Sequence, residues 1–355
     1  MSDVYVIAEA GVNHNGCKQK AFDLIDAAAA AGADAVKFQT FEAKRLAAAS
    51  APKASYQNRT TEVSQTQLEM LQALELPREW HVPLQAHARS RGIEFLSTAF
   101  DKHSLAFLET LDLPFYKVAS GELTNGPLLA EFARTGRPLV VSTGMATLSE
   151  VEQALAVICY ALADETPAPS FNAIWRCWSE PASRERLQGK VSLLHCTSQY
   201  PTEMREVNLK AMDTLSRVFQ LPVGYSDHTD GTLIPVAAVA RGATIIEKHF
   251  TLDRSLPGPD HEASLEPREL SEMVASIRSI ALALGDGCKV PQESEWDTRR
   301  AARQNLVAAV DIRRGEIFSE DNVTTARVGH GELGLAYWDR LGQTAARDYH
   351  AGEAL

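Results

Sequence analysis

Short apolar runs alternate along most of the chain with amphipathic or alanine-rich stretches. The apolar runs are nearly continuous, which is typical of strands buried on both faces of a parallel sheet. The stretches between them, such as 18–32 and 148–163, have the spacing of helices. The expected strands are 4–8, 34–39, 93–98, 115–120, 138–143, 191–196, 221–226 and 243–249. Eight strands separated by helices favour a (β/α)8 TIM barrel, with an open doubly wound sheet as the alternative.

Two segments interrupt this alternation, and the pattern changes near the C-terminus. Residues 40–92 form a long excursion after the second expected strand, and residues 164–190, rich in Pro, Trp and Arg, resemble a surface insertion. We therefore expect a barrel over 1–287, a polar linker over 288–300, and a small β-rich domain over 301–355. A domain that small needs support from the barrel or from a partner subunit.

Composition narrows the class of protein. Of 355 residues, 35 are Lys or Arg and 46 are Asp or Glu, so the net charge of −11 argues against a nucleic-acid partner. It says little against an anionic substrate, because a local cluster of cations can override the total. There is no apolar run long enough to cross a bilayer and no signal-peptide pattern, and five cysteines without a CxxC pair fit a reducing compartment. These features predict a cytoplasmic protein with no membrane partner.

Polar side chains stand at the ends of seven of the eight expected strands. Catalytic groups of a TIM barrel come from the C-terminal ends of its strands, so these positions are candidates for chemistry. In chain order they are Glu9; Lys37 and Gln39; Lys117, Ser120 and Glu122; Ser142 and Thr143; Ser198, Gln199 and Tyr200; Ser226, Asp227 and His228; and Glu247 and His249. Agreement among so many strands is harder to obtain by chance than any single motif.

Two of these residues are candidate metal ligands. His228 and His249 end adjacent strands, which run about 4.8 Å apart. Two imidazoles there could bind one divalent ion and leave other positions open for water and substrate. Glu247, on the same strand face as His249, could orient a ligand or a bound water. The alternative is a pair of hydrogen-bonded core histidines.

Two lysines at strand ends are candidates for binding an anion. A lysine inside a barrel mouth is costly to desolvate unless it meets a negative charge. Lys37 and Lys117 would form a pocket for a phosphate plus a carboxylate, with the hydroxyls of Ser120 and Ser226 as further hydrogen-bond donors. The alternative is a structural pair with Glu9 or Glu122.

Other polar residues at these ends are expected to be structural. Lys248 points away from its neighbours on the strand, and Asp227 is expected to brace a loop. The sequence has neither a Walker loop nor a GxGxxG nucleotide-binding motif.

An ordered set of motifs resembles a known family. "AEAGVNHNG", "GADAVKFQTF", "APKASYQ", "KVASGEL", "STGMAT", "GYSDHT", "IIEKHFTLD" and "GPDHEASLEP" occur in this order, and together they resemble the sialic acid synthases, including the legionaminic acid synthases. "RRGEIFSEDNVTTARVGHG" resembles their C-terminal antifreeze-like (SAF) domain. The resemblance implies a TIM barrel joined to that domain and a domain-swapped homodimer in which each small domain caps the partner's barrel. It also implies condensation of phosphoenolpyruvate with a 2-acetamido mannose-type sugar.

The resemblance also implies roles for individual residues. His228 and His249 would bind a divalent ion, Mn²⁺, Mg²⁺ or Co²⁺, with Glu247 beside it. Phosphoenolpyruvate would be held by Lys37, Lys117, Ser120 and Ser226. The sugar and the proton movements would involve Glu9, Gln39, Asn58, Glu122, Tyr200 and Asp260. Arg327 would reach the sugar's N-acetyl group across the dimer. Ser198 stands where family members often have Asn, which leaves a contact with phosphoenolpyruvate there open.

Three functions follow as alternatives. The main prediction is a synthase that condenses phosphoenolpyruvate with N-acetylmannosamine to give N-acetylneuraminate and phosphate. The alternative is a legionaminic acid synthase that uses 2,4-diacetamido-2,4,6-trideoxymannose. A pseudaminic acid synthase fits less well, because "KFQTF" and "APKASYQ" are closer to the sialic and legionaminic branches than to the pseudaminic one. A remote alternative is a non-catalytic carbohydrate-binding protein.

Overall fold

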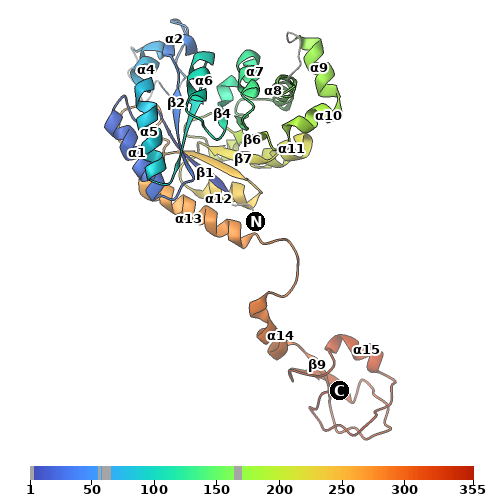
Figure 1. Cartoon of the computed structure of the whole chain (residues 1–355). Helices are drawn as coiled ribbons and strands as arrows, with labels where there is room; N and C mark the ends of the chain where they lie inside the picture. The colour runs from blue at the N-terminus through green and yellow to red at the C-terminus, as the bar shows by residue number, and fades with distance from the viewer. Residues whose placement is uncertain (1–3, 55–56, 58–64, 164–169) are drawn as a thin grey trace. The chain divides into compact units, whose positions relative to one another are not determined.

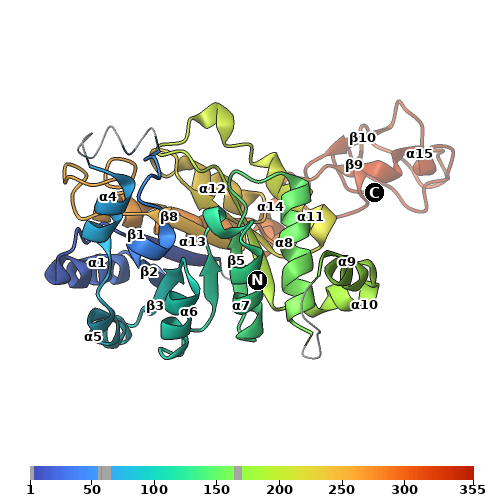
Figure 2. The ribbon, with the colours of Figure 1, turned by 90° about the horizontal axis from the view of Figure 1, so that it is seen from above.

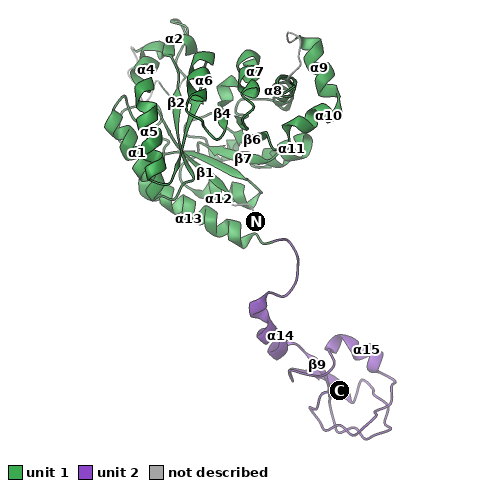
Figure 3. Cartoon of the chain, viewed as in Figure 1, with its two compact units in different colours: residues 1–285 green, residues 286–355 purple. Residues whose placement is uncertain are grey.

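The chain forms two compact units, residues 1–285 and residues 286–355 (Figure 3). The structure is a computed structural model. It describes residues 4–54, 57, 65–163 and 170–355. No helix among these residues is long and apolar enough to cross a membrane.

The first unit is a barrel of eight parallel strands. They are β1 (Tyr5–Gly11), β2 (Ala35–Thr40), β3 (Glu94–Ala99), β4 (Tyr116–Val118), β5 (Leu139–Ser142), β6 (Val191–Cys196), β7 (Val223–Asp227) and β8 (Ile245–His249). Hydrogen-bonded neighbours follow the order β3-β2-β1-β8-β7-β6-β5-β4, so the first strand pairs with the last. The end strands β3 and β4 lie in contact, which nearly closes the barrel. The predicted TIM barrel is confirmed.

Helices surround the strands (Figure 1 and Figure 2). They are α1 (Lys18–Ala30), α2 (Ala43–Leu46), α4 (Gln67–Leu74), α5 (Arg78–Ser90), α6 (Lys102–Glu109), α7 (Gly126–Arg134), α8 (Leu148–Ala161), α9 (Phe171–Ser179), α10 (Pro181–Arg184), α11 (Lys210–Phe219), α12 (Leu233–Ala240) and α13 (Pro267–Ala283). Two of them begin with a capping box formed by a threonine and a glutamate. Thr66 and Glu69 cap α4, and Thr147 and Glu150 cap α8, so first-turn amides that lack helical partners are satisfied.

Side chains of the strands alternate between the barrel interior and the helix layer. Val6, Val36 and Ile246 belong to the core formed with the helices. Ile7, Ala35 and Leu96 form a separate apolar cluster with Tyr5, Phe115 and Ile245. Side chains two residues apart on a strand point to the same side. Glu9, Lys37 and Glu247, two residues after Ile7, Ala35 and Ile245, therefore lie on the same side as this apolar cluster. The apolar cluster therefore forms a floor below a polar layer at the C-terminal end.

The two segments that interrupt the strand–helix alternation, 40–92 and 164–190, lie in different places in the fold. Helices α2, α4 and α5 belong to the long excursion after β2. The described part of the insertion forms α9 and α10, which pack against α8 on the outside of the barrel. Trp178 is buried there, and its indole Nε1 donates to Glu152 Oε1 at 2.9 Å.

The second unit contains a two-stranded antiparallel sheet. Strand β9 (Asn305–Ala308) pairs with β10 (Val323–Ala326), with Ala308 opposite Val323. Its core consists of Leu306, Ala308, Ile312, Phe318, Val323 and Ala345. Helices α14 (Trp296–Ala302) and α15 (Tyr337–Arg340) complete the unit, so the end of the expected linker 288–300 is helical.

Candidate active site

A cavity of about 460 Å³ lies at the C-terminal ends of the strands. It gathers fourteen of the residues predicted from the sequence. They are Glu9, Lys37, Gln39, Lys117, Ser120, Glu122, Ser142, Ser198, Tyr200, Ser226, His228, Glu247, His249 and Asp260. These residues come from seven strands and the loops that follow them. They meet because side chains alternate between the two faces of each parallel strand and because all the strands end at the same side of the barrel.

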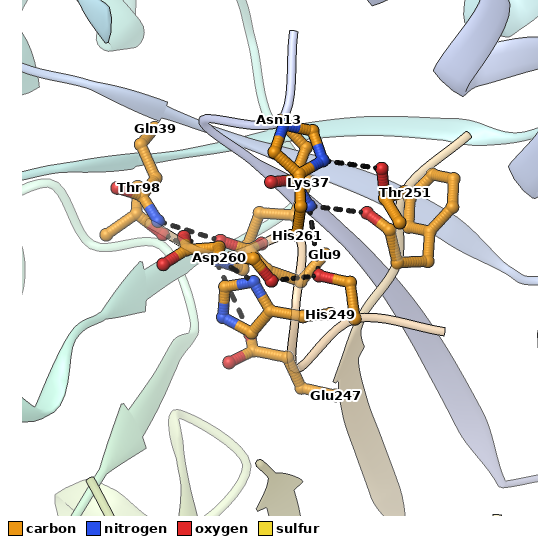
Figure 4. Close-up of polar contacts among 12 residues, drawn as sticks. Glu9, Asn13, Lys37, Gln39, Thr98, Glu247, His249, Thr251, Asp260 and His261 are labelled. Carbon is orange, nitrogen blue, oxygen red and sulfur yellow. Dashed lines mark hydrogen bonds and ion pairs between the residues drawn. The ribbon is translucent and has the colours of Figure 1, made fainter. Parts of the chain in front are cut away.

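Lys37 stands at the centre of a buried charge network (Figure 4). Its Nζ lies 2.6 Å from Glu9 Oε2 and 3.5 Å from Glu247 Oε2, and it donates to Thr98 Oγ1 at 3.0 Å. Gln39 Nε2 donates to the other oxygen of Glu9 at 3.1 Å. The Lys37–Glu9 pair considered from the sequence therefore forms, inside the cavity.

Glu247 joins the two lysines. Its Oε1 lies 3.3 Å from Lys117 Nζ and accepts a hydrogen bond from Ser226 Oγ at 2.9 Å. Both lysines are nearly fully buried, at 2% and 5% exposure for Lys37 and Lys117. A buried ammonium is stable only beside negative charge, so the carboxylates hold the lysines at this depth.

The charges of this network shift one another's pKa. Burial raises the pKa of Glu9 to about 6, against the opposing attraction of Lys37. Burial also acts to raise the pKa of Glu247, but Lys117 and Lys37 outweigh it and hold that pKa well below its usual range. Burial lowers the pKa of Lys117, with Glu247 opposing. Glu247 is therefore the permanent anion of the group, whereas Glu9 can exchange a proton near neutral pH.

The two imidazoles face the same cavity. The ring centroids of His228 and His249 lie 5.4 Å apart, and the ring of Tyr200 lies 4.0 Å from His228 and 5.5 Å from His249. His228 Nδ1 donates to the carbonyl of Thr197 at 2.8 Å, which leaves Nε2 with a lone pair. His249 Nδ1 is buried without a hydrogen-bond partner in the described structure.

This pair could serve as ligands for a divalent ion. Burial, followed by repulsion from His228, holds the pKa of His249 well below its usual range. Burial acts to lower the pKa of His228, but Cys196 outweighs it and raises that pKa. The backbone bond that fixes the tautomer of His228 is typical of metal-ligating histidines. The described residues contain no cluster of three or more His, Cys, Asp or Glu arranged to hold a metal. Two imidazoles would leave the other coordination positions of an ion to water or substrate.

Two backbone loops complete the other side of the cavity. Ser120 Oγ accepts a hydrogen bond from the Gly144 amide at 3.0 Å. A Cβ on Gly144 would lie 2.3 Å from Ser198 Oγ and 2.7 Å from Ser120 Oγ, so only glycine lets the loop approach both hydroxyls. Glu122 accepts from Asn125 Nδ2 at 2.7 Å, and burial raises the pKa of Glu122.

The loop after β8 carries Asp260 and is braced from the β1 loop. Asn13 Nδ2 donates to the carbonyl of Phe250 at 2.8 Å and to Ser264 Oγ at 3.0 Å (Figure 4). Asp260 Oδ2 lies 3.8 Å from His249 Nδ1, and burial raises the pKa of Asp260 to about 6. A carboxyl group that titrates near neutral pH thus lies beside the imidazole pair.

Some predicted residues lie elsewhere. Asn58 falls outside the described residues. Arg327 directly follows β10 in the second unit. Lys248 and Asp227, expected to be structural, form a fully buried ion pair at 2.6 Å. No described residue of the insertion over 164–190 lines the cavity.

Sequence reasoning missed several lining residues. Thr98 is the next-to-last residue of β3, the strand left out of the polar pattern, and the same alternation of side chains would have identified it. Cys196, at the end of β6, also lines the cavity, with its Sγ 3.7 Å from His228 Nδ1. An apolar wall was missed altogether, because its residues have the pattern of ordinary core. It consists of Val12, Leu46, Ala47, Ala54, Met70, Leu71, Leu74 and Phe100.

Comparisons with known proteins agree with this fold. The model of the NeuB family matches residues 24–289, and the model of the SAF domain matches residues 303–355. The chain is 46% identical to the N,N'-diacetyllegionaminic acid synthase of Campylobacter jejuni, covering all of this chain and 99% of that one. It is 44% identical to the enzyme of the same name from Legionella pneumophila, over 99% of this chain and 93% of that one.

A solved structure is also similar. The N-acetylneuraminic acid (sialic acid) synthetase from Leptospira borgpetersenii, in complex with citrate, aligns with a TM-score of 0.68 at 33% identity. The alignment covers 84% of this chain and 90% of that one.

Proposed function

Because this chain belongs to the NeuB family, we propose that it condenses phosphoenolpyruvate with an open-chain 2-acetamido mannose-type sugar, giving a nine-carbon ulosonic acid and phosphate. The observation that carries the proposal is the placement of two buried lysines and two imidazoles in one cavity. Buried ammonium groups suit a substrate with phosphate and carboxylate groups, and the imidazoles suit a divalent ion.

The lysines and serines would bind phosphoenolpyruvate. Lys37 and Lys117 lie within ion-pair distance of Glu247, so an entering anion meets two cations that are already in position. The hydroxyls of Ser120, Ser198 and Ser226 surround the same space. Charged groups fixed in this way stabilise negative charge as phosphate departs, without a cost of reorganisation.

The reaction forms one C–C bond and one C–O bond and breaks one C–O bond. C3 of phosphoenolpyruvate attacks the aldehyde carbon of the sugar, and the aldehyde oxygen takes up a proton. Water adds to C2 and loses a proton. The resulting tetrahedral carbon expels inorganic phosphate as its new hydroxyl group gives up a second proton, taken by the phosphate, and becomes the C2 carbonyl. The carboxyl groups of Glu9 and Asp260, both with a pKa raised by burial to about 6, and Glu122 are the candidates to carry these protons.

A divalent metal on His228 and His249, Mn²⁺, Mg²⁺ or Co²⁺, would polarise the aldehyde oxygen. Tyr200, which packs against both rings, would fix their orientation and face the sugar. Glu247 would hold the lysines and tune the charge beside the metal. Asn58 and, from the second subunit of a domain-swapped homodimer, Arg327 would contact the sugar.

For the sugar, 2,4-diacetamido-2,4,6-trideoxymannose is favoured over N-acetylmannosamine. The support is the higher identity to two synthases of N,N'-diacetyllegionaminic acid, at 46% and 44%, than to the sialic acid synthetase, at 33%. The product would then be N,N'-diacetyllegionaminic acid, in place of the N-acetylneuraminate of the main prediction from sequence.

A phosphate-release assay with phosphoenolpyruvate, Mn²⁺ and each sugar in turn tests the proposal. Release that requires a sugar, with the diacetamido sugar giving the higher kcat/KM, supports it. Release with N-acetylmannosamine alone restores the main prediction from sequence. Sugar binding without any phosphate release supports the non-catalytic alternative and refutes the proposal.

A further inference from the structure

The cavity has two chemically distinct sides. One side carries the lysines, the imidazoles and the carboxyl groups that the proposed reaction uses. The other is the apolar wall defined above, with side chains from the β1 loop, from α2, from α4 and from the residue after β3. Hydroxyl-rich sugars need hydrogen-bond partners, so a wall of this kind needs a different explanation.

The wall is a built surface that the main core does not include. Val12, Phe41, Met70 and Leu74 form their own buried cluster, with Leu46, Leu71 and Phe100 packed against it. Leu46, Leu71 and Phe100 are only half-buried, and all three line the cavity. The buried members hold the wall in place, and the half-buried members present apolar area to whatever occupies the cavity.

An amide group of α4 lines the cavity beside this apolar surface. Gln67, the first residue of α4, lines the cavity, and its side chain makes no hydrogen bond within the described part of the chain. A primary amide offers both a donor and an acceptor, which is the complement of an acetamido group. The wall would suit methyl groups of a ligand, and the amide of Gln67 would suit an acetamido group of the same ligand.

We infer that the apolar wall and Gln67 form the subsite that selects a sugar with a deoxy C6 and a second acetamido group. This inference rests on the proposed function and adds the residues that set its sugar specificity. Leu46, Leu71 and Phe100 contact the C6 methyl and the acetamido methyl, and Gln67 hydrogen-bonds the acetamido amide. A hydroxyl at C6 would lose its water against this wall without gaining a partner.

The expected discrimination is moderate. Burying one methyl group against an apolar wall contributes about fourfold in affinity, and pockets of this kind discriminate by roughly tenfold to a hundredfold. The wild-type chain should therefore prefer a 6-deoxy sugar to its 6-hydroxy counterpart by about tenfold or more in kcat/KM.

The test uses three sugars and the full-length chain with Mn²⁺. They are N-acetylmannosamine, its 6-deoxy form, and the 4-acetamido-6-deoxy form. The first two differ only at C6, and the last two differ only at C4. The ratio of kcat/KM within each pair therefore reports one substituent, and losses common to all sugars cancel.

The variants address the two parts of the subsite. Leu71→Ser should lower the 6-deoxy over 6-hydroxy ratio by about threefold to tenfold, and Leu46→Ser should act in the same direction. Leu71→Met keeps the apolar area and should keep the ratio. Gln67→Met should lower the 4-acetamido over 4-hydroxy ratio while sparing the ratio at C6. Gln72→Ala, exposed on the same helix and outside the cavity lining, is the matched control.

The outcomes separate the two proposals. If the wild type releases phosphate with none of the sugars, the proposed function fails, and this inference with it. If the wild type is active but prefers the 6-hydroxy sugar, or if both Ser variants keep the ratio of Gln72→Ala, the function stands and the subsite is refuted. Thermal melting identifies a variant that has unfolded, and Leu71→Ala then replaces Leu71→Ser.

Discussion

The imidazoles of His228 and His249 lie with ring centroids 5.4 Å apart, yet their nitrogens have different surroundings. Nδ1 of His228 is bound to a backbone carbonyl, whereas Nδ1 of His249 is buried without a hydrogen-bond partner in the described structure. A buried nitrogen without a partner costs about 1–3 kcal/mol. The chain retains this cost at the point where an incoming ion would remove it.

His249→Ala should abolish metal-dependent phosphate release while leaving the barrel folded, because it removes one of the two proposed metal ligands. Mn²⁺ affinity, measured by titration calorimetry, should fall by more than about 100-fold. Removing metal from the wild type with a chelator should stop turnover, and Mn²⁺ should restore it. Full activity of the chelated wild type would contradict the metal assignment.

Gly144→Ala should disturb the anion side of the cavity. The new methyl group would have to displace the hydroxyls of Ser198 and Ser120, which lie 2.3 and 2.7 Å from its position. Displacements of this size cost about tenfold or more in catalysis, and KM for phosphoenolpyruvate should rise. Gly126→Ala, where an added Cβ has nothing within 4 Å, is the control and should behave as wild type.

Asp227→Leu should destabilise the barrel by about 3–5 kcal/mol, because it leaves the fully buried ammonium of Lys248 without its carboxylate. The double variant Asp227→Leu/Lys248→Met should regain most of this loss, since no charge is then left uncompensated. Urea denaturation followed by circular dichroism measures both. If the double variant is no more stable than the single one, the loss of stability comes from the hydrogen bonds that Thr229 donates to the carboxylate of Asp227.

The stability of the barrel should fall between pH 8 and pH 5 through His81. Its Nε2 is hydrogen-bonded to Thr40 Oγ1 at 2.7 Å, and burial lowers the pKa of His81 to about 4. The unfolded chain takes up a proton near pH 6.5 and the folded chain does not, so stability is lost as pH falls below 6.5.

The loss at pH 5 should be about 2 kcal/mol. Urea midpoints across this range should therefore decline more steeply for the wild type than for His81→Gln. His103→Gln, at an exposed position, should keep the slope of the wild type. Equal slopes for all three chains would rule out His81 as the source.

The strands and the polar half of the site could be predicted from sequence because both follow from one periodicity. A strand with period two that ends in Glu247 and His249 must place both on one face, and a barrel turns that face inward. Lys248, at the intervening position, was separated from them by the same rule and lies in a buried pair outside the cavity.

The apolar half could not be predicted. Leu46 and Leu71 lie in the excursion between β2 and β3, where the chain returns to the cavity by tertiary packing that no local pattern reveals. A leucine at helical spacing has the same signature whether it faces core or ligand. The helix α14 was missed for a related reason, because its sequence is polar and lacks an apolar stripe.

The pairing of Lys37 and Lys117 with Glu9 and Glu247 leaves this group of four side chains close to electroneutral. A multiply charged ester that enters alone would leave surplus negative charge in a place poorly screened by solvent. Entry together with a divalent cation avoids that surplus. Affinity for the ester and affinity for the cation should therefore be thermodynamically linked, each strengthening the other by the same factor.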